Sequence, residues 1–243
     1  MAKAWTKFPY ADKAYVQTAA GLKKNWERLH RGDAEPFPKS DAVVQAWIEF
    51  HAGDFGKAAE LGLAAGNDGL NVANKAQAIY ANYLEDDDRR KLALLEEVAE
   101  RAAALQADMP KNANAYYWQA YALGRYAQGI SVAKALAQGI GGKVKSALET
   151  TIRLAPKHAD AHTALASYHA EVIDKVGAMI GGLTYGAKKD TALKNYQAAL
   201  KLNPDSAIAR VEYANGLVML EGRKALKQAE TLYAEAAACE PLD

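Results

Sequence analysis

Alanine-rich stretches that mix small, large apolar and polar residues fill most of the chain, and prolines punctuate them. Four of the seven prolines each follow such a stretch by a few residues: Pro110, Pro156, Pro204 and Pro241. Proline clashes with the preceding helical turn and lacks an N–H donor, so the pattern predicts helices that end just before these positions. Their recurrence about every forty residues indicates one repeated supersecondary unit with insertions.

Apolar and small residues keep a fixed register to the prolines. At equal distances before Pro204 and Pro241 the sequence repeats Ala, Tyr, Ala, and a small residue recurs at one distance after three of the prolines. The positions are Ala192, Tyr196, Ala199 and Ala229, Tyr233, Ala236, then Ala120, Ala166 and Ala214. Spacings of four and three place such residues on one helical face, and a small residue lets a second helix approach closely. Each unit is therefore predicted to be a helical hairpin.

These hairpins define the expected fold, an all-α, right-handed stack of about five hairpins. Their expected ranges are 40–66, 70–108, 112–154, 159–202 and 205–239. A helix from about Ala11 to His30 is expected before them, followed by the proline-containing loop Arg31–Ser40. The predicted organisation is residues 1–39 as N-terminal helix and loop, 40–110 as degenerate hairpins, and 111–243 as repeats with apolar glycine-rich insertions.

The repeat resembles the tetratricopeptide repeat. The likeness is clearest in TALKNYQAALKLNPDSAIARVEYANGLVML, from Thr191 to Leu220, and an earlier copy is suggested by Gly53, Phe55 and Ala58. The resemblance implies a helical-hairpin solenoid whose first helices line a concave groove. It implies a role in protein binding rather than catalysis.

A narrower resemblance covers the C-terminal half. Residues 161–204 resemble the regulator of microtubule dynamics proteins and their bacterial relatives. The corresponding residues are His162, Glu171 with Val172, Thr184 with Gly186, and Ala192 with Leu193. The membrane anchor of the animal members has no counterpart here, so their microtubule role is not carried over.

Composition and charge narrow the function classes. Thirty Lys plus Arg stand against 29 Asp plus Glu, a net charge of +1 that lacks the positive field needed for non-specific nucleic-acid binding. Cys239 is the single cysteine, which excludes an internal disulfide framework. No apolar run is long enough to span a membrane, and no signal peptide is visible. Together these features favour a cytoplasmic location.

Candidate chemistry is sparse. His158 and His162 have the spacing that allows two imidazoles to share a metal, but no cysteine or paired Glu completes a ligand set. We therefore expect no metal site, and expect His162 and His169 to pack between helices with ring N–H groups bonded to carbonyls. The segment Ala137–Val144 does not match the phosphate-binding P-loop. A P-loop has Gly where Ala137 stands and Ser or Thr where Val144 stands. No nucleophile has a motif around it, so neither an enzyme nor a cofactor is predicted.

Two insertions depart from the usual surface composition. Gly129–Gly142 contains Lys134 as its one charge, and Gly177–Gly186 contains none. We expect ordered helical extensions buried against each other, with an apolar ridge for a partner helix or lipid surface as the alternative. Lys143, Lys145, Lys188 and Lys189 fall where the second helices begin and are predicted to form a basic rim, which an acidic partner surface would explain.

The leading functional hypothesis is a non-enzymatic scaffold that binds a peptide or helix in the groove. The resemblance to the tetratricopeptide repeat assigns the groove to residues of the first helices. The predicted partner-binding residues are Asn114, Tyr117, Tyr121, Arg125, Thr163, Ser167, Glu171 and Asn215. The Lys and Asn pattern that grips a C-terminal carboxylate in some repeats is absent here. The alternative is a small-ligand binder with a pocket lined by the insertions and histidines.

Overall fold

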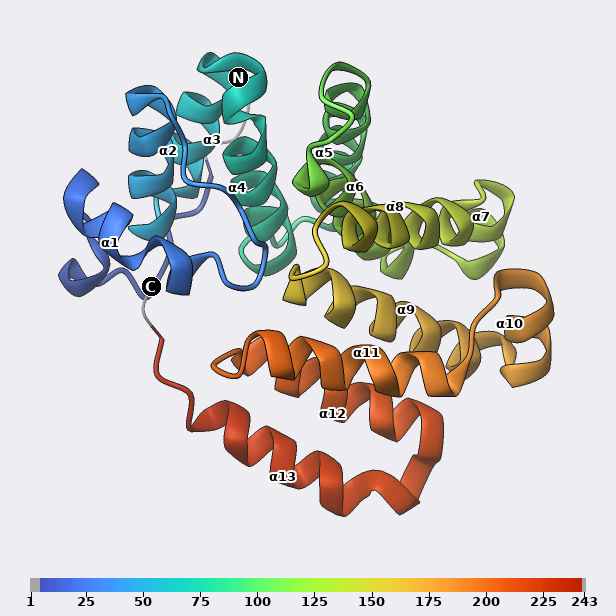
Figure 1. Cartoon of the computed structure of the whole chain (residues 1–243). Coiled ribbons are helices and arrows are strands. Elements are labelled where there is room, and N and C mark those ends of the chain that lie inside the picture. The colour runs from blue at the N-terminus through green and yellow to red at the C-terminus, as the bar shows by residue number, and fades with distance from the viewer. Residues whose placement is uncertain (1–4, 242–243) are drawn as a thin grey trace. The chain divides into compact units, whose positions relative to one another are not determined.

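The computed structural model describes residues 5–241, and these residues form helices and no strands (Figure 1). The predicted all-α architecture of successive helical hairpins is confirmed. Contacts divide the described chain into two compact units. Unit 1 comprises residues 5–29 and 35–140, and unit 2 comprises residues 30–34 and 141–241. The predicted boundaries at 39 and 110 follow composition rather than contacts and stay a prediction.

Unit 1 holds the N-terminal helix and the first hairpins. Its elements are η1 (Lys13–Tyr15), α1 (Ala19–Leu29), α2 (Asp41–His51), α3 (Phe55–Ala64), η2 (Gly66–Gly69), α4 (Leu70–Tyr83), α5 (Asp88–Asp108), α6 (Ala113–Gln128) and α7 (Val132–Ala137). Asp54, Asp87 and Asn112 cap α3, α5 and α6, each accepting a hydrogen bond from a first-turn backbone N–H. Side-chain chemistry therefore fixes where these helices begin.

The N-terminal helix is shorter than the predicted span of residues 11–30. The Thr18 hydroxyl accepts a hydrogen bond from the Gly21 N–H at 3.1 Å, so α1 begins at Ala19. Before it, the Asp12 carboxylate accepts from the Ala14 N–H and caps the separate turn η1. The expected helical start at Ala11 is wrong because these two polar side chains satisfy local N–H groups outside a continuous helix.

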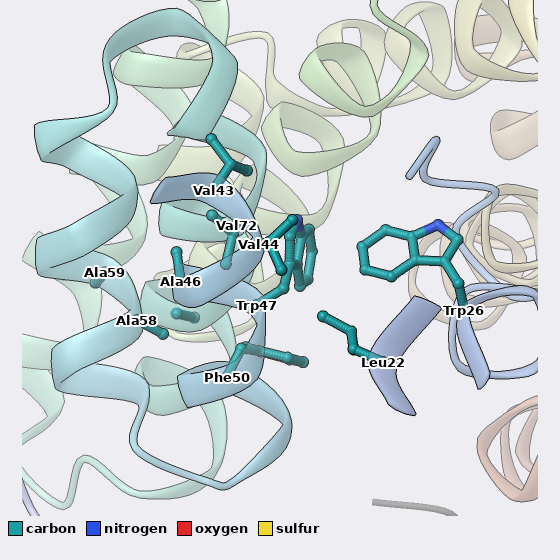
Figure 2. Close-up of a cluster of buried hydrophobic side chains, with 11 residues drawn as sticks. Leu22, Trp26, Val43, Val44, Ala46, Trp47, Phe50, Ala58, Ala59 and Val72 are labelled. Atoms are coloured by element: carbon teal, nitrogen blue, oxygen red, sulfur yellow. The ribbon is translucent and has the colours of Figure 1, made fainter. Parts of the chain in front are cut away.

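The core of unit 1 is built around two tryptophans (Figure 2). Trp26 of α1 meets Trp47 of α2 edge to face, with ring centroids 5.6 Å apart. Ala46 and Ala58, both fully buried, let α2 and α3 approach closely. Gly53 joins these helices with a φ of +83°, a left-handed conformation that favours glycine. The turn that the sequence suggests at Gly53 is therefore present.

Unit 2 holds the later hairpins. Its elements are α8 (Ile140–Leu154, whose first residue belongs to unit 1), α9 (Ala159–Val176), α10 (Ala178–Tyr185), α11 (Lys189–Leu202), α12 (Ala207–Glu221), η3 (Gly222–Ala225) and α13 (Leu226–Ala237). Tyr196 of α11 stacks on Tyr213 of α12 with centroids 4.9 Å apart. Ala192, Tyr196 and Ala199 are buried, as expected for residues that pack between helices.

The helix ends follow the proline pattern. Helices α5, α8, α11 and α13 each end a few residues before a proline, at Asp108, Leu154, Leu202 and Ala237. Four of the five predicted hairpin ranges agree with helix pairs that pack together inside one unit: α2 and α3, α4 and α5, α9 and α11, and α12 and α13. The range 112–154 contains α6, α7 and α8 and runs from unit 1 into unit 2, so its hairpin stays a prediction. Helices α7 and α10 are the two insertions. Among residues 5–241 no helix is both long and apolar enough to cross a membrane.

Candidate functional site

The first helices of neighbouring hairpins lie side by side, α2 with α4 and α4 with α6 in unit 1, and α9 with α12 in unit 2. In unit 1, part of the loop that precedes the hairpins crosses the starts of α4 and α6. The Glu35 carboxylate accepts hydrogen bonds from the Asn71 side-chain amide at 2.9 and 3.1 Å. It also accepts one from the Asn114 amide at 2.5 Å. Asn112 bonds to Asn71 at 3.2 Å. We call Asn71, Asn112 and Asn114 the amide cradle.

Aromatic contacts fix the same segment on either side of the carboxylate. The Trp26 indole N–H donates to the Glu35 carbonyl oxygen at 2.8 Å. The Phe37 ring meets Trp26 edge to face, at 5.0 Å between centroids, and the Lys23 ammonium lies 5.8 Å from the centre of Phe37. An irregular, non-helical stretch of chain is thus held on unit 1 by backbone, carboxylate and aromatic contacts together.

Sequence reasoning placed Asn114 in the groove but missed Glu35, Asn71 and Asn112. The available signal was the asparagine at the start of both α4 and α6 together with a loop carboxylate directly before two prolines. Asn71 and Asn114 are buried, and buried side-chain amides need hydrogen-bond partners. The fold supplies that partner from a loop far away in the sequence.

The other predicted residues of unit 1 follow Asn114 along α6. Tyr117 is 6% exposed and packs edge-on against Trp118, with centroids 4.9 Å apart. The Tyr121 hydroxyl is buried, and this burial raises the pKa of Tyr121. The Arg125 guanidinium lies over the Tyr121 ring at 5.4 Å and donates to Gln128. Tyr117 thus acts in packing here, while Tyr121 and Arg125 are both half-buried.

The predicted residues of unit 2 also make internal hydrogen bonds. The Thr163 hydroxyl donates to the Ala159 carbonyl at 3.2 Å. Ser167 lies 3.0 Å from the Tyr196 hydroxyl and donates to Glu212 at 3.3 Å. Asn215 accepts from the Tyr233 hydroxyl at 2.5 Å. Glu171, on α9, is half-buried. The Ser167 contacts link α9 to α11 and α12, and the Asn215 contact links α12 to α13, so two of the four residues connect neighbouring helices.

The four rim lysines fall into two pairs. Lys145 forms an ion pair with Glu149 at 2.5 Å, and Lys189 forms one with Glu221 at 3.0 Å. Lys143 and Lys188 are exposed and have no ion-pair partner in the part of the chain that the structure describes. An acidic partner is therefore unnecessary for Lys145 and Lys189, and the basic rim stays a prediction.

The histidines are bound internally. His158 caps α9, its Nδ1 accepting from the Ala161 N–H at 3.0 Å. His162 lies 2.7 Å from the Asn195 side-chain oxygen and 3.3 Å from the Pro156 carbonyl. The His169 Nδ1 accepts from the Lys188 backbone N–H at 3.3 Å, where a carbonyl partner was expected. Burial, then Lys145, lowers the pKa of His169 to about 4, so the neutral ring that this acceptor role needs is present at neutral pH.

Both insertions are helical, as predicted, but the expected burial of their apolar side chains is wrong. Met179, Ile180 and Leu183 of α10 are 76%, 53% and 86% exposed. Val132 and Leu136 of α7 are about half exposed. On α10 it is Gly181 that faces α9, where an added Cβ would lie 3.3 Å from Val172. Because glycine occupies the packed side, the large side chains are left on the outer side.

These observations leave little for the small-ligand alternative. Its pocket was expected to be lined by insertions and histidines, yet the three histidines contact protein groups and the large side chains of α10 point away from α9. Within residues 5–241, no group of three or more His, Cys, Asp or Glu residues is placed to hold a metal ion.

Comparison with known proteins agrees on the fold. No model of a protein family matches the chain, and no curated protein matches it. A solved structure that does match is a thermophilic TPR protein of Thermus thermophilus, with a TM-score of 0.60 and 18% identity. The match covers 84% of this chain and 92% of the other. At this identity the likeness shows a tetratricopeptide-like helical fold. It does not show a relationship with the regulator of microtubule dynamics proteins.

Proposed function

We propose that the protein is a non-enzymatic scaffold that binds an extended segment of a partner protein along the first helices of its hairpins. The observation that supports this most directly is the amide cradle. There, side chains at the starts of α4 and α6 hold a non-helical stretch of polypeptide through the Glu35 carboxylate. Because Glu35 occupies these amides, the partner segment is proposed to bind farther along the first helices, at Arg125 of α6 or Glu171 of α9.

The tetratricopeptide-like fold supports the same proposal, because within each unit the hairpins that pack on their neighbours leave the faces of their first helices side by side. Arg125 continues the line of Asn114, Tyr117 and Tyr121 along α6, and Glu171 lies on α9 of unit 2. Both are half-buried charged residues, which suits partner contacts that combine packing with a directional polar group. Thr163, Ser167 and Asn215 act in this proposal by holding the surface in shape.

The class of partner follows from charge. A net charge of +1 favours a protein partner over a nucleic acid.

Two further hypotheses rest on the sequence. The relationship of residues 161–204 to the regulator of microtubule dynamics proteins is based on sequence likeness, and the cytoplasmic location is based on the composition and charge described above. A catalytic role is not proposed because no nucleophile has a motif around it.

Selection of linear peptides from a phage-displayed library on the purified protein tests the proposal. Selected peptides should bind the wild type and bind Arg125→Ala or Glu171→Ala at least tenfold more weakly. Glu60→Ala is the matched control, because Glu60 lies exposed on the second helix of its hairpin. Failure to select any peptide, or equal binding by all three variants, would argue against a peptide-binding surface on the first helices.

A further inference from the structure

Helix α10 leaves an apolar face uncovered in unit 2. Met179, Ile180 and Leu183 lie at one, three and four-residue spacings, so their side chains share one side of the helix. All three are at least half exposed, and Leu183 is 86% exposed. Isolated exposed apolar residues are ordinary, but three large ones on two turns of one short helix form a contiguous patch.

The fold holds this face outward. Gly181 on the opposite side approaches Val172 and Val176 of α9, and its N–H donates to the Gly177 carbonyl. The Ala187 N–H donates to the Gly181 carbonyl, which closes the connection back towards α11. Figure 1 shows α10 at the end of the hairpin formed by α9 and α11. The apolar face is therefore held at a tip and has a defined orientation.

Charged side chains flank helix α10 but are absent from it. Residues 176–187 contain no charged side chain, and the segment is bounded by Lys175 on one side and by Lys188 and Lys189 on the other. Lys145 at the start of α8 lies beside the same connection, since its Cε is 3.6 Å from the Cβ position of Gly186, and Lys143 precedes it by two residues on α8. Four lysines thus border an uncharged helix, and Lys143 lies near them on α8.

The balance of these charges is positive. Glu149 pairs with Lys145 and Glu221 pairs with Lys189, which leaves three exposed lysines without an ion-pair partner among the described residues: Lys143, Lys175 and Lys188. The exposed carboxylates next to them are Asp174 and Asp190. A lysine places its ammonium at the level of a charged surface while its stem lies along apolar material.

We propose that α10 docks unit 2 on an anionic lipid bilayer, with Met179, Ile180 and Leu183 entering the boundary between headgroups and acyl chains. The surrounding lysines then meet lipid phosphates and carboxylates. An apolar helical face of this size in the plane of the interface, bordered by lysines, is the pattern of peripheral membrane binding. A partner helix would satisfy the apolar face but would leave the border of lysines without a role.

Flotation of the full chain with vesicles tests the proposal. One set of vesicles contains phosphatidylcholine and the other contains phosphatidylcholine with about 30% phosphatidylserine, the proportion chosen to provide surface charge. We expect binding to the anionic vesicles that weakens between low and moderate salt. Met179→Ser, Ile180→Ser and Leu183→Ser combined should reduce binding at least tenfold, because each loses apolar area from the interface. Lys143→Glu, Lys175→Glu and Lys188→Glu combined should remove the preference for anionic vesicles.

Leu63→Ser with Leu226→Ser is the matched control, because both leucines are about half exposed on other helices. This variant should float as the wild type does, and circular dichroism should show equal helix content for all variants. Absence of wild-type binding at low salt would overturn the proposal, as would unchanged binding by the triple serine variant. A wild-type dimer in sedimentation equilibrium that the serine variant abolishes, without vesicle binding, would instead identify a second copy of the chain as the occupant.

Discussion

The carboxylate of Glu35 and the side-chain amide of Asn114 lie 2.5 Å apart although 79 positions separate them in the chain. This contact joins the loop before the hairpins to the start of α6. Asn71, at the start of α4, donates to the same carboxylate. One acidic side chain therefore satisfies amides from two successive hairpins of unit 1.

Glu35→Ala should lower the free energy of unfolding by about 1–3 kcal/mol, because it removes the hydrogen bonds that two buried amides donate to the carboxylate. Urea denaturation followed by circular dichroism measures the change. Glu60→Ala serves as the control, since the Lys57–Glu60 ion pair is exposed and should contribute less than about 1 kcal/mol. Equal effects of the two substitutions would show that the amide cradle does not stabilise unit 1.

Two helical glycines should respond in opposite directions to alanine. At Gly216 an added Cβ would lie 2.6 Å from the Tyr196 Cζ, and Tyr196 is only 1% exposed and has no room to move. Gly216→Ala should therefore destabilise the protein by about 1–3 kcal/mol. At Gly124 an added Cβ meets nothing within 4 Å, so Gly124→Ala should stabilise by about 0.5–1 kcal/mol. Thermal denaturation of both variants tests this prediction. The midpoint should fall for Gly216→Ala and rise for Gly124→Ala, and changes of the same sign would contradict it.

Stability should decrease on acidification in a way that depends on His169. Its pKa is about 4 in the fold, below the ordinary value of 6.5, so the unfolded chain takes up a proton first as the pH decreases. The resulting loss between pH 7 and pH 5 is about 2 kcal/mol. The charged groups that face the ring are Lys145, Lys188 and Glu149.

Urea denaturation at pH 7, 6 and 5 measures this loss in the wild type and in His169→Gln, which keeps a side-chain acceptor for the Lys188 N–H. The variant should show a shallower decrease in stability over this range. Parallel curves would mean that another group is responsible for the acid sensitivity.

Substitutions of Tyr117 and Arg125 on α6 should differ in their effect on stability, because Tyr117 packs in the fold and Arg125 is proposed to bind a partner. Tyr117→Ala removes a ring that is 6% exposed and should destabilise unit 1 by about 3 kcal/mol. Arg125→Ala removes a half-buried side chain and should cost about 1 kcal/mol or less. Thermal melts of the two variants test this difference. A Tyr117→Ala melt equal to that of the wild type would contradict the packing role of the ring.

Sequence patterns predicted the fold well because the determinants of hairpins are local. Prolines end helices, and the repeat of Ala192, Tyr196 and Ala199 places buried residues on one face, so both features can be read without knowing the partner helix. The beginning of α1 was missed because Thr18 competes locally with a longer helix. The exposure of Leu183 was missed because the burial of an apolar side chain depends on which side of α10 packs on α9.

The candidate site was less predictable for the same reason. Asn114 was assigned to the groove from its register, but its partner Glu35 is distant in sequence and belongs to a loop without periodicity. Tyr117 and Tyr121 have the register of groove residues, yet the size of the ring and the contacts of Trp118 and Arg125 decide how much of each is exposed. Register fixes the face of a helix, and tertiary packing decides what remains accessible there.

Site-specific photo-crosslinking in cells tests the scaffold function most directly. A photoreactive amino acid replaces Arg125 or Glu171 on the first helices, and Glu60 serves as the control on a second helix. Both first-helix positions should give discrete adducts, identified by mass spectrometry as the same partner protein, and the Glu60 position should not give them. Adducts that are absent from Arg125 and Glu171, or equally abundant at Glu60, would contradict a partner-binding surface on the first helices.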